Sequence, residues 1–113
     1  MRRGEIWTVA GAGDYAGKPR PPVILQDNRF DATESITICT FTTNQTDAPL
    51  FRIPVDPNDR NGLRARCRLM ADKITTLSKK KLRSRVDRLD DVDMVRVNRA
   101  ILVFSGSLGN KQG

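Results

Sequence analysis

The sequence contains no histidine, only two cysteines and 5% aromatic residues. The absence of histidine excludes the His–His ribonuclease mechanism, Ser–His–Asp and Cys–His nucleophile systems and histidine-ligated metal sites. Cys39 and Cys67 cannot form a zinc site alone and lie in no Cys-x-x-Cys pair. We interpret them as small buried residues in a reducing compartment. Any hydrolytic chemistry must therefore use carboxylates, Arg, Lys, hydroxyl groups or a bound ion.

Long hydrophobic runs are also missing. The longest apolar stretch within a predicted helix, residues 101–104, is far too short to cross a bilayer. The N-terminal residues 1–5 turn polar where a signal peptide would continue apolar. These features predict a cytoplasmic protein with no membrane partner.

Positive charge, in contrast, is abundant. Lys and Arg number 20 against 13 Asp and Glu, which gives a formal net charge of +7 on 113 residues. The length predicts one domain, residues 1–113. The charge favours a polyanionic partner, although a basic surface kept for solubility is the alternative.

Short β-branched and alternating segments dominate the chain, and they predict a mainly β fold. We expect strands at residues 5–10, 22–26, 36–43, 50–55 and 64–74, with a glycine-rich loop at residues 11–19. The strand at residues 36–43 has no cleanly polar face, which predicts a central position. No helix of crossover length separates the strands, so we expect antiparallel pairing in a small barrel or a highly twisted sheet.

Two helical segments are expected near the C-terminus. Ser78 can cap a short turn that ends at Leu82, and Asp90 can cap a helix over residues 91–108. The buried stripe of this helix is predicted to be Met94, Val97, Ile101, Phe104 and Leu108. Apolar residues off the stripe leave a surface for a second contact, and a dimer partner is one candidate; they are Val92, Val95, Leu102 and Val103.

Three segments could carry chemistry. Lys18 and Arg20 lie where the glycine-rich loop enters the second strand, and flanking prolines restrict the backbone of Arg20. Residues 40–46 are dense in hydroxyls and amides that can bind phosphate oxygens, 2′-hydroxyls or base edges. Alternation places Arg64, Arg66 and Arg68 on one exposed strand face, where guanidinium groups suit phosphate binding. Each segment alone could equally be ordinary polar surface.

Five segments occur in a characteristic order along nearly the whole chain. They are Arg3-Gly4-Glu5-Ile6-Trp7, Arg20-Pro21-Pro22-Val23-Ile24-Leu25-Gln26-Asp27, Cys39-Thr40-Phe41-Thr42-Thr43, Met70-Ala71-Asp72-Lys73-Ile74, and the ending from Leu89 to Leu108. In this order and spacing they resemble the MazF/PemK family of toxin ribonucleases. The resemblance implies an SH3-like barrel (CcdB/PemK-like) of about five to seven short antiparallel strands with a C-terminal helix.

The same resemblance implies the activity and its partners. It implies a homodimer that cleaves single-stranded RNA at short sequences, without a metal or other cofactor, and that a labile, acidic, MazE-like antitoxin inhibits. The catalytic arginine and threonine of the family fall on Arg20 and Thr42. Further RNA contacts are predicted for Lys18, Thr43, Asn44, Gln45, Arg66, Arg68, Asp72 and Lys73. Lys73 and Thr75 depart from the family's usual glutamine and arginine, which predicts an altered base preference.

RNA carries its own nucleophile, the 2′-hydroxyl, so an enzyme has only to align it, stabilise the phosphorane and protonate the leaving 5′-oxygen. The general base is open among Asp72, Asp27, water and a perturbed arginine. Two other functions also stay open at this point. One is a protein-directed toxin of the same fold, such as a gyrase poison, and the other is a non-catalytic RNA-binding barrel.

Overall fold

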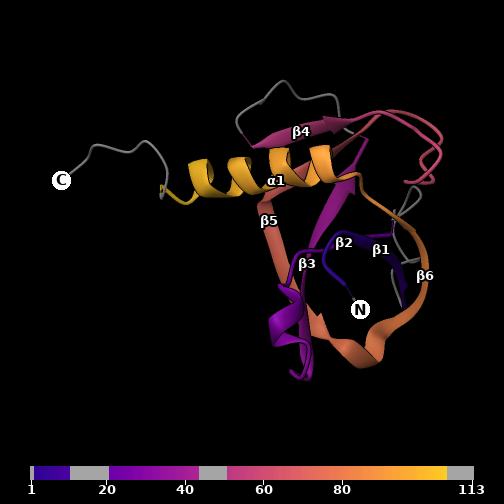
Figure 1. Cartoon of the computed structure of the whole chain (residues 1–113), viewed down its shortest axis with the longest axis vertical. Coiled ribbons are helices and arrows are strands. Elements are labelled where there is room, and N and C mark those ends of the chain that lie inside the picture. The colour runs from indigo at the N-terminus through magenta and orange to yellow at the C-terminus, as the bar shows by residue number, and fades with distance from the viewer. Residues whose placement is uncertain (1, 11–20, 44–50, 107–113) are drawn as a thin grey trace.

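The computed structural model describes residues 2–10, 21–43 and 51–106 of the chain (Figure 1). The elements, in chain order, are β1 (Glu5–Val9), β2 (Val23–Ile24), the 3₁₀ helix η2 (Asn28–Phe30), β3 (Ser35–Thr42), β4 (Arg52–Val55), β5 (Cys67–Ser78), the 3₁₀ helix η3 (Lys79–Lys81), β6 (Leu82–Arg88) and α1 (Asp91–Phe104). Within these residues, six strands form one antiparallel sheet in the order β4-β5-β3-β2-β1-β6. The mainly β, antiparallel prediction is confirmed, and β3 lies centrally as expected.

The main core lies where α1 packs across β4 and β5 (Figure 1). Met94, Val97 and Ala100 of α1 are buried there against apolar residues of the strands. The predicted stripe is therefore correct over the first turns of the helix. Phe104 is 54% exposed, although its ring lies 5.6 Å from that of Phe51, and Leu108 falls outside the described residues.

Asp90 occupies the N-cap position of α1 but makes no capping hydrogen bond with its side chain. Its carboxylate instead accepts hydrogen bonds from Asn58 Nδ2 at 2.9 Å and from Arg60 Nη1 at 3.4 Å. The start of α1 is thereby tied to the turn after β4. No helix among the described residues is both long and apolar enough to span a membrane.

The predicted strand at residues 64–74 was wrong at both ends, because β5 runs from Cys67 to Ser78. The turn before it extends further than the sequence suggests, since the buried side chain of Asn61 holds it together. Asn61 Nδ2 donates to the Asp56 carbonyl at 2.8 Å, and Asn61 Oδ1 accepts from Leu63 N at 3.0 Å. Gly62 follows with φ +68°, a conformation that favours glycine. The chain becomes extended only at Cys67, so the three arginines do not share one strand face.

The strand β6 was not predicted from the sequence. Its only buried residue is Leu82, and the six residues that follow are exposed or half-buried, so they show no period-two pattern. Pairing with β1, from Glu5 opposite Arg88 to Val9 opposite Leu82, makes this polar segment a strand. Long-range hydrogen bonding to β1 therefore decides its structure.

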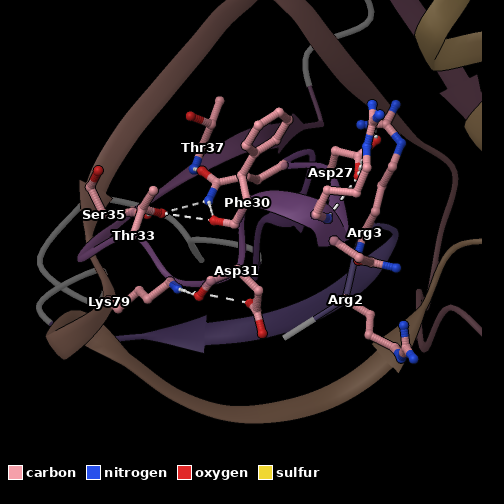
Figure 2. Close-up of polar contacts among 12 residues, drawn as sticks. Arg2, Arg3, Asp27, Phe30, Asp31, Thr33, Ser35, Thr37 and Lys79 are labelled. Atoms are coloured by element: carbon pink, nitrogen blue, oxygen red, sulfur yellow. Dashed lines mark hydrogen bonds and ion pairs between the residues drawn. The ribbon is translucent and has the colours of Figure 1, made fainter.

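The connection from β2 to β3 is organised by side-chain hydrogen bonds (Figure 2). Gln26 donates to the Phe30 carbonyl at 2.8 Å and accepts from Thr37 N at 3.2 Å. The Asp27 carboxylate caps η2 by accepting from Arg29 N at 2.8 Å. Figure 2 also shows Lys79, the first residue of η3, reaching Asp31, with 3.8 Å between its Nζ and Asp31 Oδ1. At least one lysine of the 79–81 run thus has a structural contact, and Ser78 caps η3 as predicted.

Candidate active site

The neighbouring ends of β3, β4 and β5 carry a row of outward-facing side chains. Phe41, Ile53 and Leu69 point into the core, and the residues next to them along each strand face the opposite way. Thr42 of β3 lies opposite Arg68 of β5, and Pro54 of β4 lies opposite Arg68 on its other side. Two residues that the sequence placed in the site are thus brought side by side. We call this outward face of β3, β4 and β5 the Thr42 face.

The prolines before β2 enter the sheet at the same end of β3. Val23 pairs with Cys39 in antiparallel register, so the chain preceding Val23 runs in the direction of Thr42. The carbonyl of Pro22 accepts a hydrogen bond from Trp7 N at 3.1 Å, which fixes this entry. Pro21 is covalently bonded to Arg20, the predicted catalytic arginine. Four predicted site residues lie outside the described residues: Lys18, Arg20, Asn44 and Gln45.

Sequence reasoning missed one charged residue of this face, Arg52 of β4. Its Nε lies 2.8 Å from Asp72 Oδ1 and its Nη2 lies 3.1 Å from Asp72 Oδ2, which makes a two-point ion pair. The Arg52 guanidinium lowers the pKa of the Asp72 carboxyl below its ordinary value. The side chains of Arg52 and Asp72 are only 14% and 15% exposed. The available signal was the alternation of Arg52 with the apolar residues Ile53 and Val55, but its partner could not be read from local sequence.

The other described residues that the sequence predicted as RNA contacts do not all lie on the Thr42 face. Arg66 lies before β5 and pairs with Asp56, with 2.7 Å between Nε and Oδ1 and both side chains exposed. Arg64 is exposed in the same segment, so neither residue belongs to the strand face. Lys73 is exposed immediately after Asp72, and Thr43 is exposed immediately after β3. The structure therefore collects Thr42, Arg68 and Asp72 on one face, together with Arg52.

The two carboxylates considered as general bases differ in position. Leu25 N donates to the Thr37 carbonyl at 2.9 Å, which places Asp27 near the first half of β3. Thr42 lies five positions after Thr37, about 16 Å along an extended strand. Asp27 is thus at the far end of β3 from Thr42. Asp72 lies on the Thr42 face, but the lowered pKa of its carboxyl makes it a weaker base than a free aspartate.

The two cysteines behave as expected from the sequence. Cys39 and Cys67 are buried free thiols in the main core. Burial raises the pKa of the Cys39 thiol to about 12, so this thiol stays protonated at neutral pH. Within residues 2–10, 21–43 and 51–106, no three cysteine or carboxylate side chains converge as potential metal ligands.

Comparison with known proteins decides the family. Residues 2–105 match the family described as "PemK-like, MazF-like toxin of type II toxin-antitoxin system". The chain belongs to this toxin family. It is 54% identical over 109 residues to the "Probable endoribonuclease MazF" of Mycolicibacterium smegmatis, covering 96% of this chain and all of that protein.

Solved structures show the same fold as this PemK/MazF family chain. A mycobacterial endoribonuclease in complex with its cognate antitoxin matches with a TM-score of 0.74 at 24% identity, covering 100% of this chain and 99% of the other. MazF in a MazE–MazF complex from Deinococcus radiodurans also gives 0.74 at 17% identity, covering 94% and 96% of the two chains. The predicted architecture of a MazF-like sheet with a C-terminal helix is confirmed.

The Arg52–Asp72 pair predicts a pH-dependent contribution to stability. Asp72→Asn leaves the Arg52 guanidinium partly buried without an anionic partner, and we expect the free energy of unfolding to fall by about 1–3 kcal/mol at pH 7. The folded-state pKa of Asp72 is depressed, so its stabilisation is present above the unfolded pKa and is lost as pH falls through the folded value. Urea unfolding of both proteins at several pH values should therefore give a difference in unfolding free energy that begins to shrink below about pH 4 and disappears only below the lowered pKa of folded Asp72.

Asp56→Asn provides a matched control for that measurement. Asp56 pairs with Arg66 through the same atoms, at 2.7 and 3.3 Å, but its side chain is 67% exposed. We expect a much smaller loss than for Asp72→Asn, since exposed ion pairs contribute little. Equal losses for the two variants would show that burial of the Arg52–Asp72 pair has no energetic consequence.

Proposed function

We propose that this chain is the toxin of a type II toxin–antitoxin pair and acts as a sequence-specific endoribonuclease on single-stranded RNA. Cleavage of mRNA would inhibit translation and growth. The observation that carries the proposal is the 54% identity, over 96% of the chain, to a protein described as an endoribonuclease of the MazF type. The basic charge of the chain and the hydroxyl and guanidinium groups of the Thr42 face support an RNA substrate.

The proposed mechanism uses the ribose 2′-hydroxyl as nucleophile. Arg20 stabilises the charge that develops on the non-bridging oxygens of the phosphorane, and the Thr42 hydroxyl holds the phosphate. The 2′-hydroxyl loses its proton and its oxygen forms a bond to phosphorus, while the bond to the 5′-oxygen breaks and that oxygen takes up a proton. The products are a 2′,3′-cyclic phosphate and a 5′-hydroxyl, and no metal or cofactor takes part.

Contacts along the RNA would come from the other residues that the sequence assigned. Arg68 is one of them, and it lies opposite Thr42, where its guanidinium group suits a phosphate. The others are Lys18, Thr43, Asn44, Gln45, Arg66, Asp72 and Lys73. Arg66 would have to exchange its ion pair with Asp56 for a phosphate, which an exposed pair allows at small cost.

We further propose a homodimer, an acidic MazE-like antitoxin as partner, and a cytoplasmic location. Exposed apolar side chains on α1 support a protein–protein contact, since Val92 is 72% and Val95 65% exposed. The net charge of +7 supports an acidic inhibitor. The solved relatives with antitoxins bound support the same pairing here.

The first experiment is incubation of purified protein with total RNA in EDTA. Discrete cleavage products support the proposed function. Intact RNA with a blocked topoisomerase would favour the protein-directed toxin, and intact RNA with a mobility shift would favour a non-catalytic RNA-binding barrel. Family membership does not support either alternative. The two phenylalanines exposed by more than half, Phe30 of η2 and Phe104 of α1, also lie off the Thr42 face, where a stacking platform would be needed.

Thr42→Ala is expected to slow cleavage by up to about tenfold, because a hydrogen bond from an uncharged hydroxyl contributes about 0.5–1.5 kcal/mol. Thr42→Ser retains the hydroxyl and should cleave at close to the wild-type rate. Single-turnover rates on a short oligonucleotide measure both. Equal rates for the alanine and serine variants would remove the hydroxyl of Thr42 from the mechanism.

A further inference from the structure

Arg52 and Asp72 differ from the other ion pairs of the described residues. Both side chains of the Arg52–Asp72 pair are less than one-fifth exposed. In each of the other ion pairs of the described residues, at least one side chain is more than 40% exposed. Partial burial of two charges carries a desolvation cost that their attraction only roughly offsets. Stability alone is therefore a weak reason for such a pair on the outward side of a sheet.

The backbone around Asp72 is not fixed by regular pairing with β3. Between Cys39 and Phe41 of β3 lies one residue, whereas between their partners Ile74 and Leu69 of β5 lie four, residues 70–73. Met70 pairs with Arg52 across to β4, and Ala71 N donates to the Phe51 carbonyl at 2.9 Å. Asp72 is the next residue, beyond the described ladder to β4. The two hydrogen bonds from the Arg52 side chain thus hold the Asp72 side chain at a position that the ladders of the described residues do not reach.

The chemistry of the pair restricts what it can bind. The lowered pKa keeps Asp72 ionised at neutral pH, and an ionised carboxylate only accepts hydrogen bonds. It repels a phosphate, so on an RNA-binding face its partner is a hydrogen-bond donor. Cytosine, adenine and guanine carry exocyclic amino groups, whereas uracil presents a carbonyl oxygen at the position where cytosine has its amino group. Two lone pairs of the carboxylate oxygens are engaged by Arg52, and others remain for a base.

We propose that Arg52 is a positioning residue for base recognition, which fixes the Asp72 carboxylate as an acceptor on the Thr42 face, and that Asp72 selects a nucleobase bearing an amino group. This inference rests on the proposed function, since it needs RNA bound across the Thr42 face. Arg52 touches no reacting atom in this arrangement. Its effect on cleavage is exerted through Asp72 and is a change in base preference.

The test begins with the cleavage site of the wild-type protein, mapped on a long RNA. Oligonucleotides with each of the four bases at each position of that site are then compared by kcat/KM. We expect one position at which an amino-bearing base is preferred over uracil. Asp72→Asn, whose amide can also donate, should reduce that preference by about tenfold. Arg52→Met should reduce it at the same position, and Arg52→Lys should retain part of it.

Arg29→Met is the matched control. Arg29 binds Asp27 through the same pair of atoms, at 3.2 and 3.3 Å, but lies in η2 and is 80% exposed. We expect its base preference to equal that of the wild type. Circular dichroism confirms folding of each variant, and the near-isosteric Asp72→Asn keeps the test decisive if Arg52→Met does not fold.

Two results would overturn the inference. One is an unchanged base preference in Asp72→Asn, and the other is an equal loss of kcat/KM for all four bases. Failure of the proposed function would look different, because the wild-type protein itself would then leave every RNA intact.

Discussion

Replacing Arg20 with alanine is expected to abolish RNA cleavage while the protein stays folded. The proposed transition state places a second negative charge on the phosphorane, and Arg20 is the guanidinium assigned to it. Loss of one preorganised donor to such a charge costs on the order of 10²–10³ in rate. The substitution leaves the described apolar core of the strands and α1 in place, so the melting temperature should change little. Single-turnover cleavage and thermal unfolding measure the two quantities.

Arg29→Ala is the control for this experiment, because Arg29 is an exposed arginine at the far end of β3 from Thr42. Arg20→Lys separates charge from geometry, since an ammonium keeps the charge but loses the planar two-point fork. We expect intermediate rates for the lysine variant. Wild-type turnover by Arg20→Ala would remove the centre of the mechanism and leave the RNA-binding barrel as the better interpretation.

Local sequence was sufficient for the elements whose apolar residues carry a clear period. The segment around β3 has apolar residues on both faces, and Ile36, Ile38, Cys39 and Phe41 are indeed buried in two separate core clusters. Met94 and Val97 follow helical spacing and are buried against the sheet. In contrast, β6 consists mainly of exposed residues and becomes a strand through its pairing with β1. Its formation depends on a partner more than 70 residues away, which no window of sequence contains.

The same distinction applies to the candidate site. Thr42 and Arg68 were predicted as site residues, and the β3–β5 register places them opposite each other. Arg52 was missed because its significance depends on Asp72, twenty residues later, and on the register between β4 and β5. The prediction that Arg64, Arg66 and Arg68 share one strand face was wrong, because alternation was extended into a turn that the Asn61 side chain holds. The sequence shows which side chains can bind a phosphate or a base. Which of them lie next to each other depends on how the strands pair.

Removing one hydroxyl from the substrate is expected to have an effect as large as removing Arg20. An oligonucleotide with a single deoxyribose on the 5′ side of the cut lacks the nucleophile, so it should bind but stay intact. The all-ribose oligonucleotide should be cleaved in EDTA to a 2′,3′-cyclic phosphate and a 5′-hydroxyl. Gel analysis, mass spectrometry of the ends and fluorescence anisotropy measure cleavage, products and binding.

The deoxy substrate discriminates between two classes of nuclease. A two-metal nuclease activates water, needs several carboxylates gathered at one point and does not use the 2′-hydroxyl. The sequence has no histidine to supplement such a set, and its aspartates are scattered along the chain. Cleavage of the deoxy oligonucleotide, or a strict requirement for Mg²⁺, would mean that water is the nucleophile and that the chemistry lies elsewhere than at Arg20 and Thr42. An intact deoxy oligonucleotide that binds as tightly as its ribose counterpart would locate the reaction at the 2′-oxygen and leave the protein the tasks of alignment and charge stabilisation.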